Sequence, residues 1–174
     1  EAHRLLSEKE LSYKVVLVGD SQVGKTSLVI RYATSTFETN LLPTMGVNIL
    51  AKELSIEGRI VTLVIWDIGA LEHYLELRKK YYSGASLAAL VYDVTRRETM
   101  ENTRVWLDEV KNCFSFNIPV VLVGNKIDLP QRAVSREEGD KFATEIRSTL
   151  TETSAKTGEN VRKLFEKIAK LCLD

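Results

Sequence analysis

The sequence contains little that could form a disulfide framework or a Cys/His metal centre. It has two cysteines, Cys113 and Cys172, and two histidines among 174 residues. Two cysteines are too few to staple a secreted scaffold, and they lack the spacing of zinc ligands. We therefore expect reduced thiols, as in a cytoplasmic protein, and no zinc site.

Net charge and long apolar runs are also missing. Lysine plus arginine and aspartate plus glutamate both total 24, so the formal net charge is zero. This balance gives no overall attraction to polyanions, and we expect no nucleic-acid partner. The longest apolar runs, such as residues 87–92, are far shorter than the roughly 20 residues of a membrane helix. We expect no transmembrane segment.

The composition is that of one folded domain. The chain has a mass of 19.6 kDa and is 44% hydrophobic and 28% charged, which is typical of a single globular unit. It has no internal repeat and no low-complexity block. We expect residues 1–12 to be a polar N-terminal extension and residues 13–174 to form one domain.

Stretches of strand length alternate with stretches of helix length, which predicts an α/β fold with a mostly parallel sheet covered by helices. The apolar runs predict strands over residues 13–19, 47–56, 60–67, 87–93, 119–124 and 149–152. Amphipathic spacing predicts helices over residues 24–33, 97–114, 135–147 and 159–171. Glu57-Gly58 between the second and third strands is typical of a tight antiparallel hairpin.

Residues 19–26 read G-D-S-Q-V-G-K-T, which fits the phosphate-loop pattern between a predicted strand and a predicted helix. Such a loop turns successive N–H groups toward phosphate oxygens, and the helix N-terminus adds its positive dipole end. Lys25 would neutralise the β- and γ-phosphates, and the Thr26 hydroxyl would hold Mg²⁺. The alternative is a strand-to-helix turn that binds no phosphate and has a surface lysine. The phosphate-binding candidates are Ser21, Gln22, Val23, Gly24, Lys25, Thr26 and Ser27.

Residues 125–128 read N-K-I-D and directly follow a buried strand, at the sheet edge where open α/β folds bind ligands. Asp128 can accept hydrogen bonds from N1–H and the 2-amino group of guanine, and adenine offers neither. Asn125 can tie this loop to the phosphate loop, and the Lys126 stem can cover the face of the base. The motif therefore favours guanine.

A second small-residue segment follows the last predicted strand. Residues 153–156 read T-S-A-K. Small side chains there would let a backbone N–H reach the guanine O6 atom. The candidates for this contact are Ser154, Ala155 and Lys156.

With these motifs in this order, the chain resembles a small GTPase of the Ras superfamily, with Rab-like features, from Tyr13 to about Leu171. Residues 43–47, 65–67, 81–85, 90–95 and 152–156 also match. The resemblance implies a three-layer P-loop NTPase fold with six strands and about five helices. It also implies a molecular switch that hydrolyses GTP to GDP with Mg²⁺, and two mobile segments that sense the γ-phosphate.

The resemblance also assigns individual roles. It carries Phe37 over as a residue that packs against the base, Thr44 as a ligand of Mg²⁺ and the γ-phosphate, and Asp67 as a metal-site carboxylate that acts through water. The implied metal set is Thr26, Thr44 and Asp67. The implied catalytic positions are Lys25, Thr44 and Leu71.

The second switch departs from the family pattern. The family continues from the strand aspartate as D-x-x-G-Q-E, whereas residues 67–72 read D-I-G-A-L-E. Leu71 stands where a glutamine orients the attacking water, and it has no donor or acceptor, so we predict slow or defective hydrolysis. Ala70 keeps the N–H that meets the γ-phosphate but disfavours positive φ by about 1 kcal/mol or more. Gln22 stands where Rab-like loops often have glycine and would crowd the phosphate loop.

No obvious substitute for the missing glutamine is present. Glu72 and His73 are polar neighbours of Leu71, but adjacent polar residues are mostly solvated. Arg78 is near in sequence, and we expect it to be a surface residue rather than an arginine finger.

The resemblance implies effector, exchange-factor and activating proteins as partners. Apolar residues of the switch regions are the candidates for this surface, namely Leu41, Leu42, Met45, Tyr74 and Leu75. For Val47, Ile49 and Trp66, a core position is an equal alternative. We expect a monomer. Cys172-Leu173-Asp174 is not a prenylation motif, so we expect a cytoplasmic protein that binds membranes peripherally only if a lipidated tail has been removed.

Two other functions stay open at this stage. A pseudo-GTPase scaffold would keep the fold and bind nucleotide weakly because of Gln22 and Ala70. The residues that count against it are Lys25, Thr26, Asn125 and Asp128. An ATP-using P-loop kinase would need to prefer adenine despite Asp128.

Overall fold

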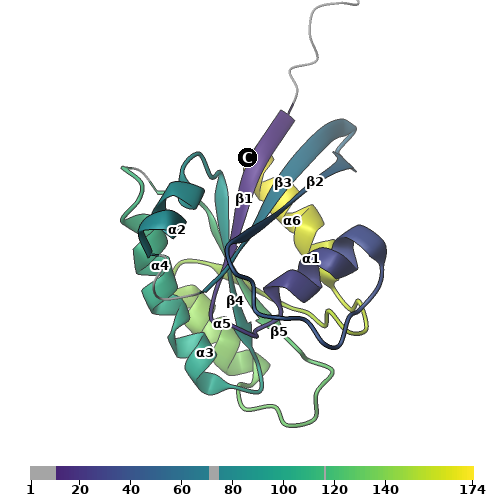
Figure 1. The fold of residues 1–174 in the computed structure, drawn as a ribbon, viewed down its shortest axis with the longest axis vertical. Coiled ribbons are helices and arrows are strands. Elements are labelled where there is room, and N and C mark those ends of the chain that lie inside the picture. The colour runs from purple at the N-terminus through teal and green to yellow at the C-terminus, as the bar shows by residue number, and fades with distance from the viewer. Residues whose placement is uncertain (1–10, 71–74, 116) are drawn as a thin grey trace, which may run out of the picture.

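The computed structural model describes residues 11–70, 75–115 and 117–174, and its ribbon shows a central sheet between two layers of helices (Figure 1). The strands are β1 (Leu11–Val18), β2 (Val47–Ile56), β3 (Arg59–Ile68), β4 (Leu87–Asp93), β5 (Val120–Asn125) and β6 (Thr149–Glu152). The helices are α1 (Lys25–Thr34), α2 (Leu75–Tyr82), α3 (Arg97–Glu101), α4 (Thr103–Lys111), α5 (Arg136–Glu145) and α6 (Val161–Leu173).

The six strands form one sheet in the order β2-β3-β1-β4-β5-β6. Only β2 and β3 pair antiparallel, and the other neighbours pair parallel. The expected α/β fold with a mostly parallel sheet is confirmed. The helix expected over residues 97–114 is divided at Asn102 into α3 and α4, but Asn102 keeps helical angles (φ −66°, ψ −17°). These two pieces therefore occupy the place of one helix.

The central strands are apolar because helices cover both faces of the sheet. All seven residues of β4 are buried. One core lies between the sheet and helices α1 and α6, with Leu28, Leu164 and Phe165 at its centre. The other core contains Tyr82, Leu107 and further residues from the α2 to α5 side. The core stripe expected for α6 is buried at Val161, Leu164, Phe165, Ile168 and Ala169.

The hairpin between β2 and β3 has the predicted turn. Glu57 and Gly58 both have left-handed backbone angles, with φ of 51° and 77°. This pair of angles matches the right-handed twist of two antiparallel strands. The pairing then runs without a bulge from Ile56 and Arg59 to Val47 and Ile68.

The strand order determines where a ligand can bind. From β1 the chain crosses to β2 and β3 on one side of the sheet, and β4, β5 and β6 lie on the other side. In open α/β sheets, a crevice forms at the carboxyl ends of the strands where this direction changes. Here that edge carries the loop after β1, the end of β3 and the loops after β5 and β6.

Two sequence-based expectations differ from the structure. β1 begins at Leu11, two residues before the predicted start at Tyr13. Arg78 is buried rather than on the surface, because its guanidinium forms a 2.7 Å ion pair with Glu109 of α4. Residues 1–10 of the expected extension lie outside the described residues. Among the described helices, none has the length and apolarity to cross a membrane.

Candidate functional site

A cavity of about 480 Å³ lies at the carboxyl edge of the sheet. Most of the residues proposed from sequence to bind nucleotide line it. These are Ser21, Gln22, Gly24, Lys25, Thr26, Ser27, Phe37, Thr44, Ala70, Asn125, Lys126, Asp128, Ala155 and Lys156. Val23 and Ser154 do not line it and are completely buried beside it. The loops after β1, β5 and β6 therefore meet around one space.

The phosphate loop is held in shape by close contacts behind it. Gly24 has φ 100°, and a Cβ built on it would lie 2.3 Å from Nδ2 of Asn125. The same Asn125 amide donates to the carbonyl of Val23 at 3.0 Å. The tie between the N-K-I-D loop and the phosphate loop is thus present as expected from sequence, and it requires glycine at position 24.

Lys25 begins α1 and lies at the floor of the cavity. Its ammonium donates to the carbonyls of Gly19 at 2.8 Å and Asp20 at 2.9 Å. Burial lowers the pKa of Lys25 to about 8, although the carboxylates of Asp67 and Asp20 act to raise it. A buried ammonium whose positive charge is only partly balanced by neighbouring groups is well suited to bind a polyanion.

The three residues of the proposed metal set meet at one point. The Thr26 hydroxyl donates to Asp67 Oδ2 at 2.5 Å and lies 2.7 Å from the Thr44 hydroxyl. Since Thr26 has one hydroxyl proton, the Thr44 hydroxyl donates to Thr26 in this arrangement. Thr26, Thr44 and Asp67 come from α1, from the segment before β2 and from β3, so only the fold brings them together.

The chemistry of this group fits Mg²⁺. Among the residues that the structure describes, Asp67 Oδ1 is one of three buried side-chain polar atoms without a hydrogen-bond partner. Mg²⁺ keeps several waters and takes few protein oxygens beside substrate phosphates. One carboxylate and two hydroxyls agree with this coordination preference. In the described ranges, no cluster of three His, Cys, Asp or Glu residues could hold a metal by itself.

The end of the cavity that the sequence predicts to bind the base, which we call the base-binding end, is built from β5, β6 and the loops after them. Asn125 Oδ1 accepts from the Thr153 hydroxyl at 3.0 Å and from the Ala155 N–H at 3.3 Å. The Ser154 hydroxyl donates to Asp128 Oδ1 at 2.7 Å. Ser154 is therefore a support for Asp128 rather than part of the cavity wall.

Arg31 of α1 was not identified from the sequence. Its guanidinium donates to the carbonyl of Ala155 at 2.7 Å, to that of Ser35 at 2.8 Å and to that of Lys156. It joins residues 155 and 156, in the loop after β6, to the C-terminal end of α1. The partners are up to 125 residues away in sequence, so no local pattern could have revealed them.

The segment of residues 35–46, which we call the first switch segment, forms one wall of the cavity. Its residues Glu38, Thr39, Leu41, Leu42 and Pro43 line the cavity together with the predicted Phe37 and Thr44. Leu42 is 87% exposed and Met45 is 70% exposed. Leu41 and Leu75 are also exposed, as expected for a partner surface.

The second switch is only partly within the described chain. Gly69 N–H donates to the Gly46 carbonyl at 2.7 Å, and a Cβ on Gly69 would lie 2.3 Å from the Thr44 carbonyl. This glycine thus lets the first switch segment approach β3. Leu71, Glu72, His73 and Tyr74 lie outside the described residues. Arg78 is paired with Glu109 and is not among the residues that line the cavity.

Comparisons with known proteins agree with this geometry. The family model described as "Ras family" matches residues 14–174. The chain is 44% identical over 164 residues to the Ras-related protein RABC2a of Arabidopsis thaliana, covering 92% of this chain and 77% of that protein. It is 41% identical over 156 residues to the Ras-related protein Rab-18 of Caenorhabditis elegans, covering 89% of this chain and 77% of that protein. The Rab-18 of Caenorhabditis briggsae is 40% identical over 156 residues, with the same shares of 89% and 77%.

Proposed function

Because the chain belongs to the Ras family and is a Rab-like small GTPase that acts as a molecular switch, we propose that it binds GTP and GDP in the 480 Å³ cavity. We further propose that it hydrolyses GTP slowly. The observation that carries the proposal is the meeting of the Lys25 ammonium, the Thr26–Thr44–Asp67 group and the Asp128 carboxylate around one space. In this order, these features suit the phosphates of one guanine nucleotide, the Mg²⁺ bound with it, and its guanine base.

Each part of the nucleotide has a partner in this proposal. Lys25 exchanges its loop carbonyls for β- and γ-phosphate oxygens, which compensate its buried charge better. Asp128, oriented by Ser154, accepts from guanine N1–H and the 2-amino group. The Lys126 stem and the Phe37 ring cover the two faces of the base.

Mg²⁺ would be held by Thr26, Thr44 and, through water, Asp67. When bound, it neutralises charge on the phosphate oxygens. Thr44 responds to the γ-phosphate because it stands on the first switch segment. Loss of that phosphate would leave this segment with fewer contacts.

Hydrolysis needs a water in line with the bond between the γ-phosphorus and the bridging oxygen. Leu71 occupies the position from which a glutamine orients this water in the family, and an isobutyl group offers neither a donor nor an acceptor. We therefore propose that the protein dwells in the GTP state. The exposed side chains of Leu41, Leu42 and Met45 would then be presented to effector, exchange-factor and activating proteins.

The first experiment is to identify the nucleotide that copurifies with the protein. We expect about one guanine nucleotide per chain, with GTP as a large fraction. Purified protein that is empty, and that does not bind added GDP, would favour a scaffold with weak nucleotide binding. Bound adenine nucleotide would instead favour the kinase alternative.

The second experiment is single-turnover hydrolysis of bound GTP. We expect this chain to be slower than the order of 10⁻⁴ s⁻¹ that is typical without an activating partner. Leu71→Gln should raise the rate at least about tenfold, equivalent to about 1.4 kcal/mol of transition-state stabilisation. Leu71→Met, which keeps an apolar side chain of similar volume, is the matched control. If the glutamine variant is no faster than the methionine variant, Leu71 is not the cause.

A further inference from the structure

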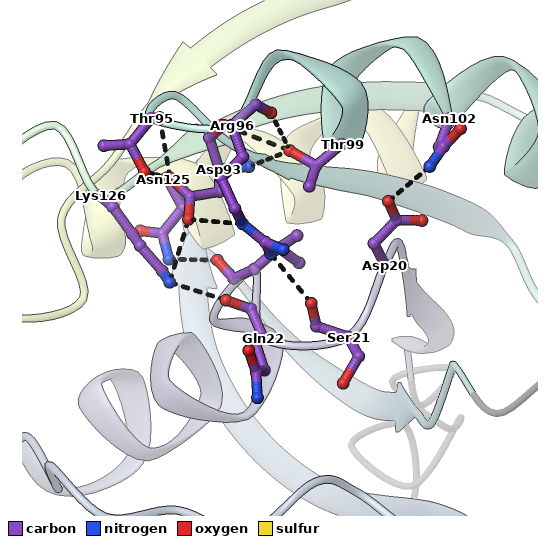
Figure 2. A network of polar contacts seen from close by, with 11 residues as sticks. Asp20, Ser21, Gln22, Asp93, Thr95, Arg96, Thr99, Asn102, Asn125 and Lys126 are labelled. Carbon is purple, nitrogen blue, oxygen red and sulfur yellow. Dashed lines mark hydrogen bonds and ion pairs between the residues drawn. The ribbon is translucent and has the colours of Figure 1, made fainter. Parts of the chain in front are cut away.

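Three consecutive carbonyls of the phosphate loop accept hydrogen bonds from side chains outside the loop. Arg96 Nη2 donates to the Ser21 carbonyl at 3.1 Å, and Lys126 Nζ donates to the Gln22 carbonyl at 2.7 Å. Asn125 Nδ2 donates to the Val23 carbonyl at 3.0 Å. Figure 2 shows Arg96 and Lys126 reaching the loop from the same side. Asn125 and Lys126 belong to the base-binding motif, but Arg96 belongs to no motif recognised in the sequence.

Arg96 and Lys126 share one carboxylate, as Figure 2 shows. Asp93 Oδ2 lies 3.1 Å from Lys126 Nζ and 3.4 Å from Arg96 Nε. Asp93 Oδ1 accepts from the Thr95 N–H at 2.8 Å and from the Thr95 hydroxyl at 2.6 Å. Both carboxylate oxygens are therefore occupied, which fixes the direction of the carboxylate and of the two cations on it.

The charge of Asp93 is stabilised where it lies. The side chain is 3% exposed, and burial alone would raise the pKa of its carboxyl. Hydrogen bonds from Thr95 and the nearby Lys126 charge outweigh burial and lower the pKa of Asp93. Asp93 is thus an anion at neutral pH and can orient both cations.

The planar trans peptide converts this arrangement into an effect on phosphate binding. A peptide C=O and the following N–H point in opposite directions. The Ser21 carbonyl and the Gln22 N–H belong to the same peptide unit, and Ser21 and Gln22 both line the cavity. Arg96, which holds the Ser21 carbonyl, is not among the cavity-lining residues, and the Gln22 N–H of the same peptide points away from it.

From this geometry we propose that Arg96, oriented by Asp93, is a positioning residue that directs the Gln22 N–H into the cavity, toward the β-phosphate of the proposed nucleotide. The inference rests on the proposed function for the identity of the ligand. Arg96 is not among the residues that line the cavity. It acts only through the Ser21–Gln22 peptide.

Gln22 makes this brace necessary. Its φ is 64°, a left-handed conformation that is unfavourable for residues with a Cβ. Without support, the loop would relax away from this angle and the Gln22 N–H would turn with it. The carbonyls on both sides of the strained residue, those of Ser21 and Gln22, are the two that the Asp93-bound cations hold.

The test compares Arg96→Met with Arg97→Met. Arg97 is an exposed neighbour that binds Glu138 and the Ala133 carbonyl, and makes no contact with the phosphate loop. We expect Arg96→Met to weaken GDP binding about five- to tenfold, the size of one ordinary hydrogen bond, while Arg97→Met stays within twofold. GMP, which lacks the β-phosphate, should bind both variants like the unchanged protein. Arg96→Lys should recover most of the GDP affinity.

Amide hydrogen exchange supplies a readout that does not need nucleotide. We expect faster exchange at residues 21–23 in Arg96→Met and unchanged exchange there in Arg97→Met. Equal loss of GMP and GDP affinity would indicate general damage and overturn the proposal, as would GDP affinity and exchange equal to those of Arg97→Met. If the unchanged protein binds no guanine nucleotide, the proposed function fails, and exchange still decides whether Arg96 braces the loop.

Discussion

The phosphate loop and the first switch segment line the same cavity, but they are held in opposite ways. The carbonyls of residues 19–23 each accept a side-chain hydrogen bond, from Lys25, Arg96, Lys126 or Asn125. The first switch segment is tied mainly at its ends, where the Ser35 carbonyl meets Arg31 and Thr44 and Gly46 meet Thr26 and Gly69. Between these ties its side chains are largely exposed.

The difference separates two tasks. A loop whose carbonyls at residues 21–23 are held by side chains from outside the loop can recognise the phosphates common to GDP and GTP with little rearrangement. A segment tied at two ends can respond to one additional phosphate, because few contacts must break for it to move. Removing a contact of the phosphate loop should therefore weaken the binding of both GDP and GTP. Removing a contact of the first switch segment should weaken GTP binding more than GDP binding.

The largest expected effect on nucleotide affinity is at Lys25, the first residue of α1. Lys25→Met should weaken GDP and GTP binding alike, by about a hundredfold to a thousandfold, because it removes a buried charge that faces the phosphates. Competition binding with a fluorescent guanine nucleotide measures both affinities. Lys141→Met, at an exposed position of α5, is the control. A loss confined to GTP would contradict the shared role of the loop.

Thr44→Ala tests the other side of the comparison. We expect about tenfold weaker GTP binding with GDP binding within twofold, since one hydrogen bond to a charged group is lost only with the triphosphate. Thr39→Ala, at an exposed position in the same segment, controls for general effects on this wall. Equal losses for GDP and GTP would mean that the segment does not discriminate between them.

Gly69→Ala should loosen the tie between the switch and β3. The added Cβ would meet the Thr44 carbonyl at 2.3 Å, whereas a Cβ on Gly46 has no atom within 4 Å. We expect faster amide exchange at residue 69, whose N–H donates to the Gly46 carbonyl, and a several-fold loss of GTP affinity, no more than the contribution of one hydrogen bond. Gly46→Ala is the matched control. Unchanged exchange in Gly69→Ala would show that the close approach is not needed.

The smallest expected effect is on the free energy of unfolding and comes from backbone strain at two left-handed residues. Gln22→Gly and Ser35→Gly each remove a Cβ from a left-handed residue, with φ of 64° and 58°. Each should raise the free energy of unfolding by up to about 1 kcal/mol, as measured by urea denaturation. A decrease for Gln22→Gly alone would mean that its side chain makes stabilising contacts that outweigh the backbone strain.

Much of the fold could be read from local patterns. Strand β4 is recognisable because it is apolar throughout, and the β2–β3 hairpin because Glu57-Gly58 accepts left-handed angles. The phosphate loop and the N-K-I-D motif have fixed spacing, so their position at the strand ends followed from the sequence. Arg78 was misjudged, since burial of an arginine depends on a partner, and Glu109 is 31 residues away.

The sequence by itself determined the family, the sheet with its helices and the residues proposed to contact the nucleotide, because periodicity and motif spacing are local properties. Only the tertiary structure decided which side chains hold those residues in place. Arg31 against Ala155, Arg96 against the phosphate loop, and Gly69 against Thr44 act across long sequence separations. Such contacts arise when strands β1, β3, β4 and β5 bring their ends to one edge, and no short window of sequence contains both partners.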